Sequence, residues 1–364
     1  METKYKYKNT PLTITRYPKT EDRTLKAWSN AEVYALEQLG EASGQHIVMY
    51  NDRFGFWNTC LNNEKLTTVW HYESQRKAIK QNLEQNGFSF NEDTLFKSTD
   101  KLNKPIDIAL VKVPKSVELF HHILEHIHAN SHKDTKVICC FMTKYFNKQI
   151  IEKSNLYFEE VEQSLAWKKS RLVHLKSPKQ EVASMKLRNI KHNGEDYKQY
   201  PGVFSASHID YASQFLMDNV EIKPEEVDVM DLASGNGVIA RFIQDKNPSS
   251  KLTLVDDYNL AIESSKLNVE NTNTTFLCAD SLDDIESDTF DLIISNPPFH
   301  FEHEINIDIT LRLMEQVQQC LKPEGRFVFV ANEHLNYKTH LIQWFTDVKI
   351  IAKNDKFVVC ECLV

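Results

Sequence analysis

Four residues that follow an apolar run carry the most distinctive potential chemistry: Asn296, Pro297, Pro298 and Phe299, in the stretch DLIISNPPFH. An apolar run of this length predicts a buried strand. The two prolines fix φ and remove two backbone donors, so the turn can offer only acceptors in a rigid arrangement. We expect the Asn296 side-chain oxygen and the Pro297 carbonyl to accept the two hydrogens of a planar exocyclic amine.

Phe299 can stack on the flat ring that carries such an amine. Bonding both hydrogens would aim the nitrogen lone pair at an electrophilic methyl group, so catalysis would rest on positioning, with no base required before attack. The stretch could instead be a rigid loop without chemistry. Its place in the sequence, on the strand after a cofactor-type turn, favours the catalytic interpretation.

The cofactor-type turn is DLASGNG, residues 231–237, between a predicted strand and a predicted helix. The small residues Ala233, Gly235 and Gly237 let the backbone approach a ligand, and the helix that follows offers its N-terminal N–H groups. The spacing is not that of a dinucleotide fingerprint. An acid at the strand end, Asp231, can hold an ammonium group, which a pyrophosphate cofactor lacks. Taken alone, the turn could also bind nothing.

Two further acids stand at the ends of the next predicted strands. Asp256 is placed to accept hydrogen bonds from ribose hydroxyls, although the adjacent Asp257 competes for that role. Asp280, after the third strand, is placed to accept from an adenine amino group. An amino acid, a ribose and an adenine together describe S-adenosylmethionine, and three acids at successive strand ends favour a ligand site.

The second half alternates strands and helices, which predicts an α/β fold with a parallel sheet covered on both faces. Its last two predicted strands, DVKIIA and KFVVCECLV, are separated only by KND, so they should form a hairpin with one strand antiparallel to the rest. A helix is expected near 306–321 and another near 335–345. The polar stretch 174–202 is interpreted as a linker followed by a hairpin-like segment.

Three segments of the first half match three segments of the second half, in the same order and with a nearly constant offset. This match indicates an internal duplication. The polar strand ends differ: Tyr50, Trp70, Lys112 and Val113 stand where the second half has Asp231, Asp256, Asn296 and Pro297. We therefore predict two tandem class I methyltransferase-like (Rossmann-like) domains, with a degenerate domain at 1–180 and a catalytic, S-adenosylmethionine-dependent domain at 181–364.

Charge is divided unevenly along the 364 residues, whose formal net charge is −8. The first 180 residues carry 27 Lys and Arg against 21 Asp and Glu, and the remainder carries 16 against 30. A basic half is suited to RNA phosphates, although ordinary surface variation would also explain it. The polar start, the absence of a bilayer-length apolar run and seven cysteines in apolar stretches predict a cytoplasmic protein with reduced thiols.

Three other groups are candidates for binding. The stretch HHILEHIHANSH contains His121, His122, His126, His128 and His132. The i, i+4 spacing within it makes a metal site conceivable, but no carboxylate or cysteine completes one, so we interpret these residues as surface imidazoles on a helix. His300 and His303 could touch the substrate or serve a structural role. An aromatic residue beside basic residues could contact RNA or lie on a solvated strand edge; this last group consists of Trp167, Lys168, Lys169 and Arg171.

DLASGNGV, NPPFH and the degenerate first half resemble the bacterial ribosomal RNA guanine-N2 methyltransferases, the RsmC/RlmG family. LTITRYP, LAWKKSRLV and NDKFVV resemble the large-subunit (23S) members more than the small-subunit (16S) members. The resemblance implies S-adenosylmethionine as cofactor, N2 of one guanine in 23S rRNA as methyl acceptor, and a cytoplasmic location. It also implies functional roles for the family's motif positions: Asp231, Gly235, Gly237, Asp256, Asp280 and Asn296 to Phe299.

One departure concerns Ala233 and Ser234, where the family usually has glycine and cysteine. An extended φ would accommodate the alanine, whereas a positive φ would strain it. The alternatives to the 23S interpretation are a 16S enzyme, a methyltransferase that acts on adenine N6 in DNA or on a protein glutamine, and a non-catalytic RNA-binding or assembly factor. The target guanine is expected to be unpaired or flipped out of its helix. No membrane partner, metal or oligomer is indicated.

Overall fold

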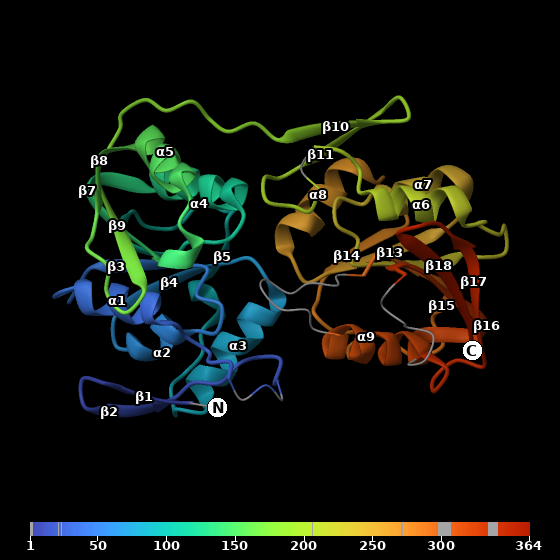
Figure 1. Ribbon diagram of the computed structural model, residues 1–364, viewed down its shortest axis with the longest axis horizontal. Helices are drawn as coiled ribbons and strands as arrows, with labels where there is room; N and C mark the ends of the chain where they lie inside the picture. The colour runs from blue at the N-terminus through green and yellow to red at the C-terminus, as the bar shows by residue number, and fades with distance from the viewer. Residues whose placement is uncertain are drawn as a thin grey trace. The chain divides into compact units, whose positions relative to one another are not determined.

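The computed structural model describes residues 3–20, 22, 24–205, 207–270, 272–297, 307–333 and 341–364, with no side chains described for 307–311. The chain divides into two compact units, Met1–Lys186 and Leu187–Val364 (Figure 1). The boundary between the two units therefore follows Lys186, a few residues after the boundary between 180 and 181 that the sequence predicts.

The first unit is built around a seven-stranded sheet of order β5-β4-β3-β6-β7-β9-β8, in which only β9 runs antiparallel to its neighbours. Helices α1, α2 and α3 lie on one face of this sheet, and α4 and α5 lie on the other (Figure 1). The elements in chain order are β1 (Lys4–Tyr7), β2 (Thr10–Thr13), α1 (Asn30–Gln38), β3 (His46–Tyr50), α2 (Phe56–Cys60), β4 (Lys65–Trp70), α3 (Glu73–Glu84), η1 (Glu92–Thr94), β5 (Leu95–Lys97), β6 (Ile106–Lys112), α4 (Val117–Ala129), β7 (Ser131–Met142), η2 (Thr143–Tyr145), α5 (Lys148–Tyr157), β8 (Phe158–Gln163) and β9 (Ser170–Pro178).

The second unit opens with the hairpin β10–β11 and has a seven-stranded sheet of order β14-β13-β12-β15-β16-β18-β17. Only β18 runs antiparallel, and it pairs with β17 in the closing hairpin expected from the sequence. Helices α6, α7 and α8 lie on one face and α9 on the other (Figure 1). The elements are β10 (Arg188–His192), β11 (Glu195–Gln199), α6 (Tyr211–Asn219), β12 (Asp228–Leu232), α7 (Val238–Lys246), β13 (Lys251–Asp256), α8 (Asn259–Asn268), β14 (Thr274–Cys278), β15 (Phe290–Ser295), α9 (Ile307–Cys320), β16 (Leu321–Asn332), β17 (Asp347–Lys353) and β18 (Phe357–Leu363). The helix expected near 335–345 falls largely outside the described residues.

The two sheets have the same strand order and the same strand directions, which confirms that one architecture occurs twice. Strand β3 corresponds to β12, β4 to β13, β5 to β14, β6 to β15 and β7 to β16. Two independent sequences would not be expected to converge on the same order of seven strands, including one reversed strand at the same place. The pairing registers therefore identify corresponding residues in the two units.

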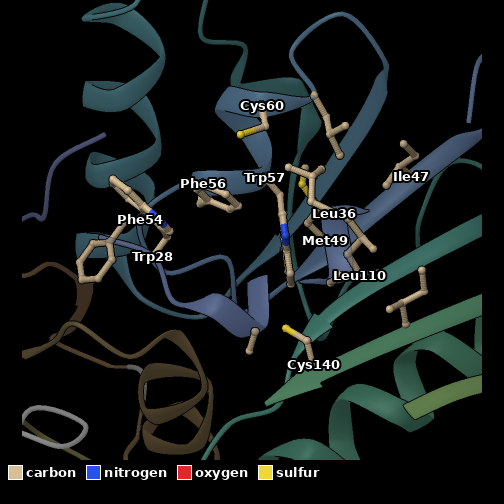
Figure 2. Packing of buried hydrophobic residues seen from close by; sticks show 14 of the residues in the cluster. Trp28, Leu36, Ile47, Met49, Phe54, Phe56, Trp57, Cys60, Leu110 and Cys140 are labelled. Carbon is tan, nitrogen blue, oxygen red and sulfur yellow. The ribbon is translucent and has the colours of Figure 1, made fainter. Parts of the chain in front are cut away.

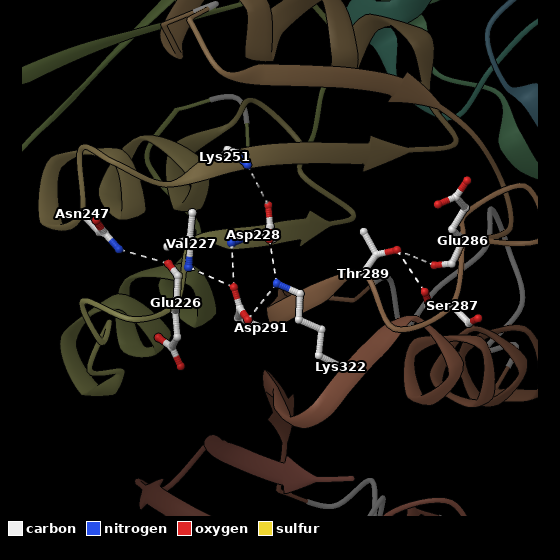
Figure 3. A network of polar contacts seen from close by, with 10 residues as sticks. All are labelled: Glu226, Val227, Asp228, Asn247, Lys251, Glu286, Ser287, Thr289, Asp291 and Lys322. Carbon is white, nitrogen blue, oxygen red and sulfur yellow. Dashed lines mark hydrogen bonds and ion pairs between the residues drawn. The ribbon is translucent and has the colours of Figure 1, made fainter.

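A polar contact at the amino ends of the strands stabilises the second sheet (Figure 3). The Asp291 carboxylate accepts the backbone N–H of Asp228 at 2.8 Å and lies 3.0 Å from the Lys322 ammonium. These hydrogen bonds and the cation lower the pKa of Asp291 below its ordinary value. The contact joins the starts of β12, β15 and β16, which are the three central strands.

The first sheet has the same contact at the corresponding positions. Asp107 accepts the backbone N–H of His46 at 2.7 Å, and its other oxygen lies 2.8 Å from Nε2 of His132. In the aligned registers, Asp107 takes the place of Asp291 and His132 that of Lys322. The duplicated fold therefore keeps the polar contact that organises its amino edge.

The registers correct one correspondence drawn from the sequence. Met49, not Tyr50, lies at the place of Asp231. The turns that follow have equal lengths when Gly55 is matched with Gly237, since each has a left-handed φ and caps the next helix. Spacing of apolar residues could not reveal this one-residue shift, because both strands are apolar on both faces.

The corresponding position in the first unit is part of an apolar core. Met49 is fully buried and packs in a cluster with Leu36, Trp57 and Leu110, between the sheet and helices α1 and α2 (Figure 2). A methionine in this place offers no acceptor for a cationic or hydroxyl-bearing ligand. The first unit has therefore replaced a carboxylate with packing.

The histidine-rich helix differs from its interpretation as a surface feature. His122 and His126 lie on the face of α4 that packs inward, where they are 8% and 7% exposed. His126 lies 2.8 Å from the Tyr50 hydroxyl and 2.8 Å from the Asp100 carbonyl. Burial lowers the pKa of His122 to about 4. His132 is not on the helix at all, since α4 ends at Ala129.

Six of the seven cysteines are buried, Cys278 is half-buried, and none forms a disulfide. Within the part of the chain that the structure describes, no three His, Cys, Asp or Glu residues are grouped to hold a metal ion. No described helix is both long enough and apolar enough to cross a membrane.

Candidate active site

The candidate residues gather at the carboxyl edge of the second sheet. Strands β14, β13, β12 and β15 are parallel neighbours, so their carboxyl ends lie side by side. This arrangement brings together Asp231, Asp256, Asp280 and Asn296, as the sequence predicts. Ligands of open α/β sheets bind at this edge. Pro298 and Phe299, the other two residues of the turn, lie outside the described residues, as do His300 and His303.

The turn after β12 leaves space on one side. Gly235 has a φ of 56°, and its N–H donates to the Asp256 carboxylate at 2.9 Å. A Cβ at Gly235 would meet no atom within 4 Å, so a ligand can approach the backbone there. Gly237 differs, because a Cβ there would lie 2.9 Å from a methyl carbon of Val269. Gly237 therefore permits close packing of the turn on the C-terminal end of α8.

Ala233 has a positive φ, which is the strained alternative to the extended φ that would accommodate an alanine. Its φ is 61°, in the left-handed region, which costs an alanine about 1–2 kcal/mol. The residue at the same place in the first unit is Asn51, with a φ of 58°, and asparagine tolerates this region better. The turn therefore keeps its conformation in both units, with a less suitable residue in the second.

Replacing Ala233 with glycine is expected to raise the free energy of unfolding by up to about 1 kcal/mol, because relief of the left-handed strain exceeds the extra chain entropy of glycine. Denaturant unfolding monitored by circular dichroism would measure this. The matched control is Ala261→Gly in α8, a buried helical alanine that should destabilise by about 1 kcal/mol. Destabilisation by both variants would contradict the strain.

Asp256 is the last residue of β13 and is fixed by the turn around it. One carboxylate oxygen accepts the Gly235 N–H at 2.9 Å, and the other accepts the Tyr258 N–H at 2.8 Å. Each oxygen retains a lone pair that could accept a ribose hydroxyl. Burial raises the pKa of Asp256 to about 6. These two contacts fix Asp256 against the turn, so its geometry suits the ribose role.

Asp231 is fully buried beneath the turn. One oxygen accepts the N–H of Ala240 in the first turn of α7 at 3.0 Å, and the other has no hydrogen-bond partner among the described residues. Burial raises the pKa of Asp231 to about 7. A buried carboxylate oxygen without a donor is uncommon in folded proteins. The acid therefore suits a site completed by an N–H-bearing ligand group, such as the ammonium end of an amino acid.

Asn296 is held by two residues at the start of helix α6. Its amide nitrogen donates to the Asp210 carboxylate at 3.0 Å and to the Ser213 hydroxyl at 2.9 Å. A carboxylate can only accept, so the amide nitrogen must face Asp210. No described residue donates to the Asn296 side-chain oxygen. The amide is thus oriented with its acceptor available to a ligand.

Sequence reasoning missed Asp210 and Ser213. Asp210 is the N-cap of α6, where its carboxylate accepts the N–H groups of Ala212 at 3.0 Å and Ser213 at 3.3 Å. An aspartate before an amphipathic helix is a signal of an N-cap, so its position could have been predicted. Its contact with Asn296 could not, because the two residues are distant in the sequence.

The first unit has a different pair at the same place. Lys112 takes the position of Asn296, and its ammonium lies 3.2 Å from the buried Glu32 carboxylate. Glu32 is the third residue of α1, as Ser213 is the third of α6. An ammonium has no acceptor for a substrate amine. The degenerate unit thus keeps a link between helix and strand end, and loses the outward acceptor.

The place of the open glycine is also occupied in the first unit. Arg53 takes the position of Gly235, is 1% exposed and donates to the Ser74 hydroxyl at 2.7 Å. Its guanidinium lies 5.1 Å from the centre of the Tyr72 ring. A buried arginine with these contacts fills the space that the glycine leaves open. Among the described residues of the first unit, this position therefore lacks the open space found beside Gly235.

Family comparisons agree with this division of the chain. Residues 2–179 match the family model described as the RLMG N-terminal domain, and residues 196–361 match the one described as the methyltransferase small domain. The solved structure of the Thermus thermophilus 16S rRNA N2 G1207 methyltransferase (RsmC), in complex with AdoMet and guanosine, superposes with a TM-score of 0.77 over 99% of this chain and 97% of that one. The chain thus combines an RLMG N-terminal domain with a methyltransferase small domain, which is consistent with the RsmC/RlmG family. The sequence identity to the Thermus protein is 18%, so this likeness concerns the fold.

Other solved structures resemble only part of this chain. A methyltransferase from Mesorhizobium loti is 15% identical, covers 42% of this chain and 98% of its own, and has a TM-score of 0.34. A TehB-like methyltransferase from Corynebacterium glutamicum is 16% identical, covers 43% and 90%, and has the same TM-score. The predicted fold class, two tandem methyltransferase-like domains with the first degenerate, is confirmed, as is membership of a methyltransferase family.

Proposed function

We propose that this protein transfers a methyl group from S-adenosylmethionine to the exocyclic N2 amine of a guanine in ribosomal RNA. The observation that carries the proposal is the orientation of Asn296. Both of its amide hydrogens are engaged by Asp210 and Ser213, so its oxygen remains to accept from an amine at the edge where three acids gather. The bound AdoMet and guanosine in the Thermus structure are the ligand chemistry that such an edge suits.

S-adenosylmethionine supplies, when bound, a methyl group on a positively charged sulfur. Asp256 would accept its ribose hydroxyls, Asp231 would face its amino-acid end, Asp280 would accept from the adenine amine, and the backbone near Ala233, Gly235 and Gly237 would border it. Asn296 and the Pro297 carbonyl would each accept one hydrogen of the guanine amine, with Phe299 and Pro298 completing the turn. This turn would hold the nitrogen in line with the methyl group. As the nitrogen–carbon bond forms and the sulfur–carbon bond breaks, one amine proton leaves to solvent.

We propose 23S rRNA as the substrate, because residues 2–179 match the RLMG N-terminal domain. The alternative is 16S rRNA, which is the substrate named for the structurally similar Thermus protein. The excess of positive charge in the first unit would help to place RNA. Its buried Arg53 takes the place where the second unit would bind the cofactor. The second unit would carry the catalytic residues.

Transfer of tritiated methyl groups from S-adenosylmethionine to purified 23S rRNA, 16S rRNA, DNA and protein tests the proposal. We expect label in 23S rRNA alone and N2-methylguanine at one position by mass spectrometry. Label only in 16S rRNA would select the alternative, and label in DNA or protein would reject RNA as substrate. Calorimetry that detects no heat with S-adenosylmethionine would favour a non-catalytic RNA-binding factor.

The contact that orients Asn296 gives a specific prediction. Ser213→Ala removes one of two acceptors for the amide, so kcat should fall by about 10-fold, the effect of one hydrogen bond, while the KM for S-adenosylmethionine stays within twofold. Asp210→Ser retains an N-cap residue but removes the carboxylate, and should lower kcat further. Steady-state kinetics would measure both.

The matched control for this prediction is Ser154→Ala. Ser154 is a buried serine of α5 whose hydroxyl donates to the Ile150 carbonyl at 2.8 Å, in the other unit. Its loss should reduce stability slightly and leave kcat unchanged. Equal effects of Ser213→Ala on kcat and on cofactor KM would show that the contact stabilises the fold without orienting the amide.

A further inference from the structure

The connection between β8 and β9 lies at the carboxyl edge of the first sheet. Ser170, which begins β9, pairs with Met142, which ends β7, and residues 164–169 form the tip of the hairpin. The short helix η2 follows β7 directly, and its Thr143 N–H donates to the Lys169 carbonyl at 2.8 Å. The hairpin tip and η2 thus form one continuous feature, which we call the hairpin-tip surface. It comprises Lys144, Tyr145, Phe146, Leu165, Trp167, Lys168 and Lys169.

The backbone of the tip is strained and held in place. Lys168 and Lys169 have φ values of 44° and 62°, a left-handed conformation that costs about 1–2 kcal/mol per residue. The Lys168 carbonyl accepts from the Asn30 side chain at 3.1 Å, and the Lys169 carbonyl accepts from Thr143. Two consecutive positive φ values are those of a two-residue type I′ hairpin turn, which Trp167 and Ser170 close with backbone hydrogen bonds of 2.9 Å and 2.8 Å. This turn places two consecutive exposed lysines at fixed positions.

Aromatic rings lie beside these cations. Trp167 stacks on Tyr34 with a centroid distance of 5.3 Å, and the Lys168 ammonium lies 4.3 Å from the Trp167 ring. The Lys144 ammonium lies 4.6 Å from the Tyr145 ring. Neither these two lysines nor Lys169 forms an ion pair with a described residue.

Large apolar groups are exposed on the same surface. Leu165 is 87% exposed, Phe146 is 42% exposed and Tyr145 is 39% exposed. Exposed apolar groups that gather on one surface beside unpaired cations indicate an interaction site. The combination of flat rings and cations is suited to a partner that offers both planar groups and negative charge.

The corresponding hairpin of the second unit lacks this combination. Its tip between β17 and β18 consists of Asn354, Asp355 and Lys356, with no aromatic ring. The neighbouring Lys353 forms an ion pair with Glu333 at 2.5 Å. Because both hairpins occupy the same place in one fold, the fold itself does not require the aromatic rings of the first unit.

We infer that the hairpin-tip surface binds single-stranded RNA, through stacking of bases on the exposed Tyr145 and Phe146 rings and on the half-buried Trp167 ring, and through phosphate contacts to its lysines. A double helix keeps its bases stacked on one another, so only unpaired bases can use these rings. This inference rests on the proposed function, since the RNA would be the strand that flanks the target guanine. It assigns a specific surface to the degenerate unit.

Fluorescence anisotropy with a labelled unstructured 12-nucleotide RNA and the full-length protein tests the inference. Trp167→Ala should raise the Kd by about 10- to 100-fold, as loss of one stacked base does. Lys168→Glu/Lys169→Glu should weaken binding and reduce the dependence of Kd on salt. Trp167→Phe keeps a ring and should restore most of the affinity, which a loss of folding alone would not permit.

The matched control is Lys353→Glu/Lys356→Glu, which changes two lysines of the equivalent hairpin in the second unit and should alter the Kd by less than twofold. Equal weakening by the control, wild-type Kd for the Trp167→Ala variant, or tighter binding of an RNA duplex than of the single strand would each overturn the inference.

The inference and the proposed function fail in different ways. If the wild-type protein binds the 12-nucleotide RNA through Trp167 but methylates no RNA, the surface stands and the proposed function is wrong. If it methylates 23S rRNA and the Trp167→Ala and Lys168→Glu/Lys169→Glu variants do so with unchanged KM, the proposed function stands and the surface is wrong.

Discussion

Replacing Asn296 with alanine should lower kcat by about 100- to 1,000-fold, the range seen when one preorganised polar group at a reaction centre is removed. The Kd for S-adenosylmethionine should change by less than threefold. Asn296 follows β15 and its described contacts are with Asp210 and Ser213, so its loss leaves the cofactor acids Asp231 and Asp256 in place. Single-turnover kinetics and calorimetry measure the two quantities separately.

Two further variants sharpen this prediction. Asn296→Asp places a second carboxylate beside Asp210, so the amide geometry is lost and kcat should fall at least as far as in the alanine variant. Asn247→Ala is the control, because Asn247 is a buried asparagine whose side chain donates to the Glu226 carbonyl at 3.0 Å, far along the chain from the turn (Figure 3). It should reduce stability and leave kcat unchanged. Equal loss of cofactor affinity and turnover in Asn296→Ala would refute the assigned role.

Much of the candidate site was predictable because strand ends can be located in a sequence. Apolar runs that end in acids fixed the positions of Asp256 and Asp280, and parallel strands must place those ends on one edge. The duplication was also visible, since Trp70 and Lys112 do lie at the places of Asp256 and Asn296. Local pattern and strand direction were sufficient for these predictions.

Other features depend on conformation or on distant contacts, which spacing does not encode. The left-handed φ of Ala233 follows from the turn that the fold imposes. The inward face of α4, which buries His122 and His126, depends on which side of the helix meets the sheet. The bond between Asp210 and Asn296 joins residues brought together only by folding.

The two units agree where the sheet needs support and differ where a ligand would bind. The amino edge keeps an acid that clamps a neighbouring strand, Asp291 in one unit and Asp107 in the other. The carboxyl edge has Asp231, Gly235 and Asn296 in one unit, but a core methionine, a buried arginine and a paired lysine in the other. The first unit therefore differs from the second by local side-chain replacements at the carboxyl edge, while the strand order of the sheet is the same.

Because only the second unit keeps these polar side chains at its carboxyl edge, we expect each chain to bind one cofactor. We also expect a change at Asp256 to weaken that binding. Asp256→Ala should raise the Kd for S-adenosylmethionine by about 10- to 100-fold, because it removes charge-assisted hydrogen bonds to the ribose. At saturating cofactor, kcat should recover to within about 10-fold of wild type, since the turn at Asn296 is not altered. Calorimetry should give a stoichiometry of one in the wild type, where Trp70 occupies the corresponding position in the first unit.

The pH dependence distinguishes this carboxylate from a merely structural one. Burial raises the pKa of Asp256 to about 6, so the carboxylate forms as the pH rises through that value, and affinity for S-adenosylmethionine should increase between about pH 5 and pH 7. The free energy of unfolding has the opposite trend, because a raised pKa means that the folded state binds more protons than the unfolded chain. The pKa of Asp256 in the unfolded chain is 3.8. The stability contributed by Asp256 is therefore fully present below pH 3.8 and is lost as the pH rises through about 6. Asp256→Ala should reduce both trends, leaving the part due to Asp231. The control Asp257→Ala should retain them, and a wild-type affinity that falls with rising pH would refute the role of Asp256.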